Sequence, residues 1–379
     1  MTPVYADSIT YQYYLKGDWE KLISTGKEAI HEHVDFKYLR QRIGYAYFVK
    51  GDYYASEEQY EKALSFDKKD SITRIYLYYC GLYTNNESLI RYRVSKLPVN
   101  EKKSLLVKPL RVLDAIDVEY NYRINRDQTR SNPNYYRIGV NSQLGYRLNL
   151  YQSFSTYGQR IDSTGISQNE YFALLSWTLT SHITLSTGYH YLSSNLVDTI
   201  TYRIDRRMKR TIIDSTFYPG HLFYVGASYR LKRFDLGING SILSYASQLT
   251  KQGEISAGYL FPGKLNLYVK SSLDGMIDPN SQRLIFTQSV GSLLSPFLWM
   301  EGKITLGNLK NYSEFNGLYI YNSDDATDFR AGLSLYWYVS KKITFLANYS
   351  YNRKEYENTN NATVYYNQHS ITSGIIWKI

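Results

Sequence analysis

A period-two alternation of apolar and polar residues limits the possible folds of this chain more than any other feature. It is clearest between residues 328 and 379. Every second position of one run there is apolar, as Phe329, Ala331, Leu333, Leu335 and Trp337 show. Because successive side chains of a strand point to opposite faces, such a run predicts a strand with one apolar face. Strands of about ten residues with one apolar face, one small or polar face and aromatic ends are typical of a transmembrane β-barrel.

From residue 116 onward the same alternation predicts 14 strands. We expect them at 116–125, 135–145, 148–159, 168–179, 183–193, 220–231, 234–245, 252–261, 264–274, 282–294, 297–308, 327–339, 342–353 and 364–379. Short turns should alternate with long segments near 126–134, 160–167, 194–219, 246–251, 275–281, 309–326 and 354–363. Outer-membrane barrels have short periplasmic turns and longer outer loops. An even number of strands returns the chain to the short-turn side, which places residues before 115 in the periplasm.

The composition agrees with a barrel. There are 42 tyrosines against 14 phenylalanines and 5 tryptophans. A tyrosine has an apolar ring and a hydroxyl group, so it suits membrane–water boundaries and a wet lumen. The mean hydropathy is −0.42, and the sequence has no apolar run of about 18 residues that would form a transmembrane helix. The single cysteine, Cys80, excludes internal disulfides and cysteine-based zinc sites.

The N-terminal quarter contains a repeat. Residues 13–30 align with residues 47–64 at an offset of 34 residues, and Lys16-Gly17-Asp18 falls on Lys50-Gly51-Asp52. A period of about 34 residues is typical of the tetratricopeptide repeat (TPR), a helix pair. The best copy is 37–70, and a degenerate third copy extends to residue 98. We therefore predict a TPR-like helical domain over 1–98, a linker over 99–114 and the antiparallel barrel over 115–379.

Several residues are candidates for binding. By their position in the repeat, Tyr38, Gln41, Tyr45 and Tyr79 would line a concave groove for a protein partner. The alternative is that these residues pack between neighbouring repeats. By the alternation, the charged residues expected to face the barrel lumen are Glu119, Arg123, Arg137, Arg230, Asp235, Lys270, Glu301, Lys303 and Arg330. About eight strands fill their own interior, so a wider barrel should hold a channel or a plug. Mixed charges fit either a wet pore or a closed network of ion pairs.

The longest connection carries a basic cluster, Arg203, Arg206, Arg207, Lys209 and Arg210. It would suit phosphates of lipopolysaccharide, an acidic glycan or a protein, and the alternative is a solvated hairpin tip. The net charge of +10 is spread over loops without a basic helix or stripe, so we expect no nucleic-acid partner. No Ser/His/acid, phosphate-loop or metal-ligand spacing is present, so we expect neither an enzyme nor a cofactor or metal. Val4-Tyr5-Ala6 fits a signal-peptide cleavage site, which would make residues 1–6 a remnant of that peptide.

A short TPR stack followed by a tyrosine-rich barrel that ends in Trp377-Lys378-Ile379 resembles TPR-containing outer-membrane barrels of the YaiO type. More loosely, it is similar to the TPR-plus-barrel exporters of exopolysaccharides. The resemblance implies a location in the outer membrane of a Gram-negative bacterium, in contact with lipid and lipopolysaccharide. It favours a channel or export component whose periplasmic TPR docks a protein partner. The alternative is a closed barrel that anchors the TPR in a larger complex, and a lipid-modifying enzyme is the third possibility.

Overall fold

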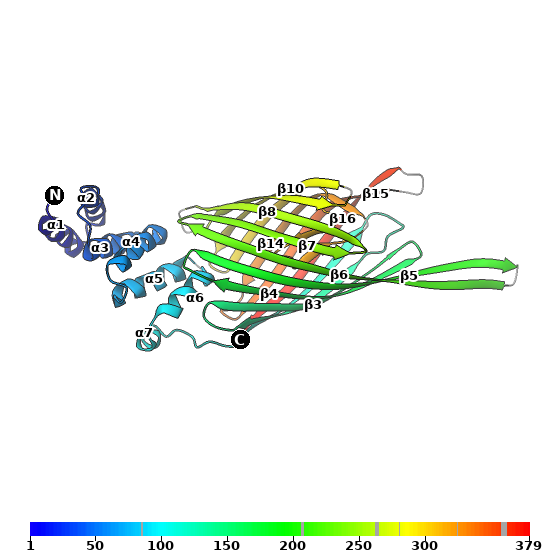
Figure 1. Ribbon diagram of the computed structural model, residues 1–379, viewed down its shortest axis with the longest axis horizontal. Helices are drawn as coiled ribbons and strands as arrows, with labels where there is room; N and C mark the ends of the chain where they lie inside the picture. The colour runs from blue at the N-terminus through cyan, green and yellow to red at the C-terminus, as the bar shows by residue number, and fades with distance from the viewer. Residues whose placement is uncertain (85, 206–207, 262–264, 280, 324, 358–361) are drawn as a thin grey trace.

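The computed structural model describes all residues except 85, 206–207, 262–264, 280, 324 and 358–361, and only the backbone of 200–205 and 208–211. It consists of an N-terminal group of helices and a closed β-barrel (Figure 1). The predicted combination of helices followed by an antiparallel barrel is therefore confirmed. Whether the helices are TPR repeats stays a prediction.

The described part of the N-terminal region forms seven helices. They are α1 (Pro3–Lys16), α2 (Trp19–His31), α3 (Lys37–Val49), α4 (Tyr53–Phe66), α5 (Ser71–Tyr83), α6 (Glu87–Lys96) and α7 (Val99–Ser104). The repeated Lys-Gly-Asp sequence explains two of the breaks between them. Gly17 and Gly51 adopt φ angles of 68° and 79°, a left-handed conformation that ends a helix at little cost in glycine. Asp18 and Asp52 then accept backbone N–H groups of the next helix and begin it.

Small residues let the helices pack closely. A Cβ atom at Gly26 would lie 2.7 Å from Cδ1 of Ile43, and one at Gly44 would lie 3.0 Å from the ring of Tyr60. Leu22 and Leu39 are fully buried in the same helical core. None of the helices in the described residues is long and apolar enough to cross a membrane.

The barrel contains 14 antiparallel strands, which correspond one to one with the predicted strands. They are β1 (Leu113–Asn125), β2 (Asn134–Gln143), β3 (Leu148–Ile161), β4 (Thr164–Thr178), β5 (Ile183–Asp205), β6 (Met208–Leu231), β7 (Phe234–Tyr245), β8 (Gln248–Leu260), β9 (Tyr268–Asp278), β10 (Ser281–Ser295), β11 (Leu298–Leu306), β14 (Ala326–Tyr338), β15 (Ile343–Glu357) and β16 (Thr363–Lys378). The first and last strands pair, with Val118 opposite Ile375, so the sheet has no free edge within the barrel.

The expected strict alternation of short and long connections is wrong. Asp162-Ser163 joins β3 to β4, and Ala246-Ser247 joins β7 to β8, where longer loops were predicted. Near the predicted loop 275–281, β9 extends to Asp278 and β10 begins at Ser281. The ladders continue into polar sequence because each further antiparallel pair satisfies backbone N–H and C=O groups. Beyond their neighbours, β5 and β6 extend together as a projecting hairpin (Figure 1).

The predicted strand at 264–274 is also displaced, because β9 begins only at Tyr268. Asn266 has a φ of 45°, which interrupts an extended strand. The strand therefore starts four residues later than the apolar pattern of Leu265 and Leu267 suggested.

The outer wall of the barrel is apolar. Phe223, Val225 and Ile238 are 61%, 63% and 63% exposed on this face. Tyrosines on the wall bond to polar groups of adjacent strands. The hydroxyl of Tyr189 lies 2.8 Å from Nδ1 of His221, and that of Tyr349 lies 2.8 Å from Nδ1 of His369. These contacts give the polar atoms of both side chains a partner on the outer wall.

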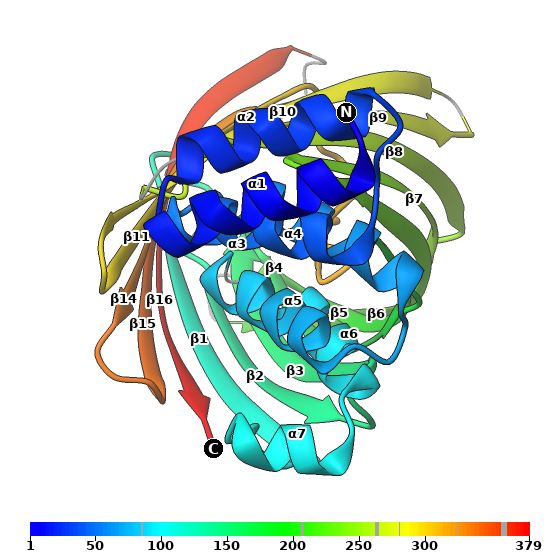
Figure 2. The ribbon, with the colours of Figure 1, turned by 90° about the vertical axis from the view of Figure 1, so that its left-hand side faces the viewer.

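The helices lie across one end of the barrel (Figure 2). This end carries the turns at 146–147, 181–182 and 232–233, and we call it the short-turn end. Arg233 on the β6–β7 turn pairs with Asp52 at 2.7 Å, and Arg91 of α6 donates to Asn149 of β3 at 2.8 Å. The opposite opening, reached by the β5–β6 hairpin, is called the far end.

Candidate functional site

The connection between β11 and β14, residues 307–325, folds into the barrel and is called the plug. It contains a small hairpin of β12 (Tyr312–Glu314) and β13 (Tyr319–Tyr321). Ser313 is hydrogen-bonded to Gln252 of β8, and its hydroxyl lies 3.0 Å from that of Ser241 on β7. At the hairpin tip, Asn316 accepts a hydrogen bond of 2.7 Å from Tyr224 of β6. The plug is therefore attached to the wall through polar side chains, in addition to the apolar packing of Leu309 and Tyr312 against Met276 and Ile285.

Glu314 places a carboxylate of the plug between two cations of the wall. It accepts a hydrogen bond from Lys303 of β11 and pairs with Arg330 of β14 at 2.7 Å. The hydroxyl of Tyr321 donates to the same carboxylate at 2.8 Å. Glu314 is buried, so these contacts are needed to offset the cost of removing its charge from water.

A second ion-pair group joins the plug to β1 and β2. Arg137 lies 2.7 Å from Glu119 and 2.8 Å from Asp117. Tyr319 of the plug donates to Glu119 at 2.7 Å. Two neighbouring carboxylates thus share one guanidinium, and the plug adds a hydroxyl donor to this group.

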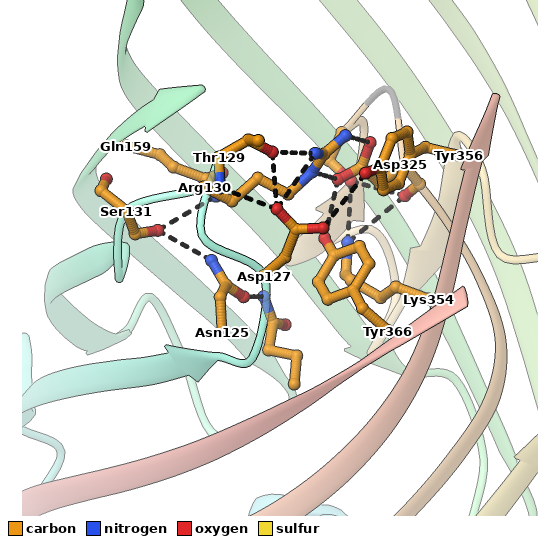
Figure 3. Close-up of polar contacts among 12 residues, drawn as sticks. Asn125, Asp127, Thr129, Arg130, Ser131, Gln159, Asp325, Lys354, Tyr356 and Tyr366 are labelled. Atoms are coloured by element: carbon orange, nitrogen blue, oxygen red, sulfur yellow. Dashed lines mark hydrogen bonds and ion pairs between the residues drawn. The ribbon is translucent and has the colours of Figure 1, made fainter. Parts of the chain in front are cut away.

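Toward the far end, the last residues of the plug join the cluster shown in Figure 3. Asp325 accepts two hydrogen bonds from Arg130 of the β1–β2 loop, at 2.5 and 3.0 Å. Tyr366 of β16 donates to the same carboxylate at 2.7 Å. The guanidinium of Arg130 lies 3.5 Å from the ring centroid of Tyr356 on β15. A bidentate pair combined with a cation–π contact fixes Arg130 in both position and orientation.

Lys354 of β15 completes this cluster from the wall. Its ammonium donates to the Ser323 hydroxyl at 3.0 Å and to the Asp325 carbonyl at 3.3 Å. Arg130, Asp325, Lys354, Tyr356 and Tyr366 are together called the rim cluster. All of them except Tyr356 are buried. The rim cluster connects an outer loop, the plug and two wall strands, so the end of the plug cannot move without breaking it.

Beside the plug a chamber of about 600 Å³ remains. It follows the wall formed by β1–β4 and β14–β16. Near the short-turn end it is lined by Tyr336 and Leu346, and near the far end by Ile161 and Ile166. Uncharged polar side chains line much of its length, as Asn348, Ser350, Asn352, Gln368, Ser370 and Thr372 illustrate. The chamber is large enough for a small solute, and its lining offers both polar and apolar contacts.

Six of the nine predicted lumen residues line this chamber, namely Glu119, Arg123, Arg137, Glu301, Lys303 and Arg330. The other three lie elsewhere. Arg230 stands 5.0 Å from the ring centroid of Tyr54 on α4, and its strand partner is Asp235. Lys270 of β9 is exposed and does not contribute to the chamber.

The predicted groove residues occupy different surroundings. Tyr38 is 57% exposed, and its ring lies beside the ammonium of Lys37. Gln41 is buried and donates to Asp70 and Thr73 at 2.7 and 2.9 Å, so both of its N–H bonds are internal.

Tyr45 and Tyr79 belong to a continuous aromatic group on the helices. Tyr45 packs against Tyr14, Trp19 and Tyr76. Tyr79 lies against Phe48, Tyr76 and Tyr78. Packing against other aromatic side chains of the helices therefore accounts for part of the surface of both rings.

The side chains of the predicted basic cluster, Arg203, Arg206, Arg207, Lys209 and Arg210, lie outside the described residues. Among the residues that are described, no group of three or more His, Cys, Asp or Glu side chains is arranged to hold a metal ion. The absence of enzymatic activity and of a cofactor stays a prediction.

The contact between the helices and the barrel was not expected from the sequence. Nε2 of His182, on the β4–β5 turn, lies 2.9 Å from Glu61 of α4. The hydrogen bond to Glu61 raises the pKa of His182, despite partial burial. Burial opposes ionisation of Glu61, but the hydrogen bonds and charges of His182 and Arg93 lower its pKa to about 2. This end of the barrel thus binds the helices through an ion pair that depends on pH.

The plug and the rim cluster were also not predicted. The segment 309–326 was recognised only as a long connection. Its sequence did contain a local indication, because Asn316-Gly317 lies between Tyr312 and Tyr319 in an alternating stretch. Asn-Gly between alternating residues predicts a hairpin. No local pattern indicates that this hairpin folds into the lumen.

No protein-family model matches the chain, and no curated protein matches it. The chain is similar in structure to the toluene transporter TodX of P. putida, with 8% identity and a TM-score of 0.47 over 73% of this chain and 91% of that one. It is also similar to a Pseudomonas aeruginosa FadL homologue, with 7% identity and a TM-score of 0.43 over 70% and 90%. Omp33 of Acinetobacter baumannii has 8% identity and a TM-score of 0.38 over 71% and 99%.

Proposed function

We propose that this protein is a gated channel in the outer membrane of a Gram-negative bacterium, and that the plug closes its lumen at rest. The proposed location is supported by a closed barrel whose outer wall exposes Phe223, Val225 and Ile238. Closed barrels are one of the two structures that satisfy all backbone groups in lipid. Contact with lipid and lipopolysaccharide follows from this location.

One observation carries the channel proposal: besides the apolar packing of Leu309 and Tyr312 against the wall, the plug is held by buried charges and hydroxyl groups, and it leaves a chamber beside it. A permanent closure is most economically built from close-packed apolar side chains. Replacing buried ion pairs by apolar residues is often neutral or stabilising, so their presence is better explained by a switch than by stability. Glu314, Arg130 and Asp325 are the residues whose contacts would be exchanged when the plug moves.

The helical unit adds a partner-binding role to this proposal. It lies at the short-turn end, which is periplasmic if the barrel is oriented as other outer-membrane barrels are. Tyr11, Tyr38 and Tyr83 are 48%, 57% and 55% exposed on its helices. Exposed tyrosines are frequent in protein interfaces, so we assign docking of a periplasmic or outer-membrane protein to this unit. Whether the channel imports or exports its solute is left to transport measurements.

The second candidate is a closed barrel that anchors the helical unit in a larger complex. It is favoured by the internal ion pairs at Glu314 and Asp325, and by the hydrogen bond from Tyr319 to Glu119, which join the plug to the barrel. A barrel of this kind would never conduct, whatever happens to the plug.

A reversible cross-link distinguishes the two candidates. Ser241 and Ser313 are both buried, and their hydroxyl oxygens are 3.0 Å apart. The double variant Ser241→Cys and Ser313→Cys, in a Cys80→Ser background, is expected to form a disulfide between the wall and the plug. The measurement is conductance in a planar bilayer, before and after addition of a reductant, with each single cysteine as the matched control.

A channel should show openings in the single-cysteine controls, silence in the oxidised double variant and recovery after reduction. Arg130→Ala, which frees Asp325, should open more often than the wild type. If none of these proteins conducts, although heat-modifiable migration shows a folded barrel, the channel proposal fails and the closed anchor is supported.

A further inference from the structure

The charged side chains that line the chamber are neutralised unequally. All three of its carboxylates already have donors within the protein. Glu119 accepts from Arg137 at 2.7 Å, and Glu170 accepts from Ser155 at 2.8 Å. Glu301 accepts from the hydroxyl of Tyr268. Each of these carboxylates thus has a donor within the protein, and Glu119 is also paired with a guanidinium.

The cations of the chamber fall into two groups. Arg137, Lys303 and Arg330 are paired with Glu119 and Glu314. Arg123 and Lys354 are not paired with a carboxylate among the described residues. Nε of Arg123 donates to the side-chain oxygen of Asn121 at 2.9 Å, and its guanidinium lies 5.7 Å from the ring centroid of Tyr157.

Lys354 is the more unusual of these two cations. It is 7% exposed, and its partners are the neutral oxygens of Ser323 and the Asp325 main chain. A buried cation is normally paired, because removing an isolated charge from water costs several kcal/mol. Among the described residues the ammonium of Lys354 is therefore bonded to neutral oxygens, and its positive charge suits a further, anionic partner.

Both cations face the same space. Arg123 lies on β1 and Lys354 on β15, the two strands that flank β16. Gln368 and Ser370 of β16 also line the chamber between them. Amide and hydroxyl donors beside two cations provide the hydrogen bonds that carboxylate and phosphate oxygens accept.

We propose that the chamber contains an oxyanion-binding site at Arg123 and Lys354, for a small solute that carries a carboxylate or phosphate group. This deepens the proposed function by naming the solute class, although binding itself does not require conduction. The ammonium of Lys354 also holds Ser323 of the plug. An anion that takes over this donor weakens one attachment of the plug, which connects solute binding to opening.

Calorimetric titration of the full chain in detergent tests the site. The probes are sodium phosphate and sodium succinate at constant ionic strength, and glycerol is the uncharged comparison. Arg123→Gln and Lys354→Met should each weaken binding about tenfold, the loss expected for a hydrogen bond between charged groups. Lys354→Arg keeps the charge and should retain most of the affinity. Lys270→Gln is the matched control, because it removes an inward cation that is outside the chamber.

Saturable binding that both charge-removing variants weaken, and the control does not, supports the site. Preference for one probe then identifies the phosphate or the carboxylate class. Absence of saturable binding to the wild type overturns the proposal, and so does an equal loss in Lys270→Gln, which would indicate a general effect of charge. Because Lys354→Met also removes a contact to the plug, Arg123→Gln provides the independent variant.

The result of this titration can be distinguished from the result of the conductance measurement. If phosphate or succinate binds to a barrel that never conducts, the site stands and the channel proposal fails. If the barrel conducts but binds neither anion, the channel stands and the anion site fails.

Discussion

The plug and the helical unit both obstruct the lumen, but the charges that hold them have different surroundings. Arg130 and Asp325 attach the plug inside the barrel and are both buried. Arg233 and Asp52 attach the helices at the short-turn end, with side chains 18% and 37% exposed. Water and salt screen the second pair much more than the first. The comparison indicates that the plug is firmly held inside the barrel, whereas the helices at the short-turn end are more easily released.

The largest effect is expected when a buried pair of the plug is broken. Arg130→Ala leaves the Asp325 carboxylate without its guanidinium, which should lower the free energy of plug opening by about 3 kcal/mol. Hydrogen exchange of the amides in 309–323 measures this quantity. Arg130→Met combined with Asp325→Leu removes both charges and should recover most of the loss. Equal exchange rates in the wild type and Arg130→Ala would show that the rim cluster does not hold the plug.

A smaller effect is expected at the tip of the plug. Gly317 has a φ of 87°, and a Cβ atom there would lie 2.8 Å from Leu222. Gly317→Ala should therefore lower the free energy of plug opening by about 1–2 kcal/mol, measured by the same exchange. Gly253→Ala is the control, because nothing lies within 4 Å of a Cβ at Gly253. If the amides of the tip were as well protected from exchange in Gly317→Ala as in Gly253→Ala, the tip would not pack against β6.

The helical unit should respond more weakly. Arg233→Ala removes a partly exposed ion pair, which should lower the free energy of docking by about 0.5 kcal/mol, and added salt should reduce the difference. Fluorescence energy transfer between dyes at Glu28 and Lys341, both exposed, reports the docked fraction. If Arg233→Ala lowered the free energy of docking by as much as Arg130→Ala lowers the free energy of plug opening, the proposed difference between the two closures would be contradicted.

The docked fraction should also depend on pH, through His182. Because docking to Glu61 raises the pKa of His182, the protonated ring favours the docked state. This contribution is complete below the ordinary histidine pKa of about 6.5 and is lost as the pH rises through the raised value. Docking should therefore weaken as the pH increases from 6 to 9 on the same fluorescence signal. His182→Gln should remove the dependence, and His31→Gln, at an exposed position, should leave it. A pH response that persists in His182→Gln would assign it to another group.

Prediction from the sequence succeeded where a pattern is local and repeated. The alternation identified every barrel strand, since one buried or lipid-facing side sets a period of two along each strand. It misjudged where β3 and β9 end and where β8 begins, because strand pairing continues past the apolar stretch and local turns such as Ala246-Ser247 set the boundary. Glu119 and Arg330 were assigned to the lumen by the same parity. Their partners Tyr319 and Glu314 were not predicted, since these residues come from the plug.

The sequence by itself determined a helical N-terminal region, a barrel with an apolar outside and the inward direction of its charged residues. These properties follow from the spacing of neighbouring residues. Only the tertiary structure decided that the β12–β13 hairpin enters the lumen, that Arg130 meets Asp325 and that Lys354 has no carboxylate partner among the described residues. Such contacts join residues that are far apart in the chain, and their free energy depends on burial and on which strands become neighbours when the barrel closes.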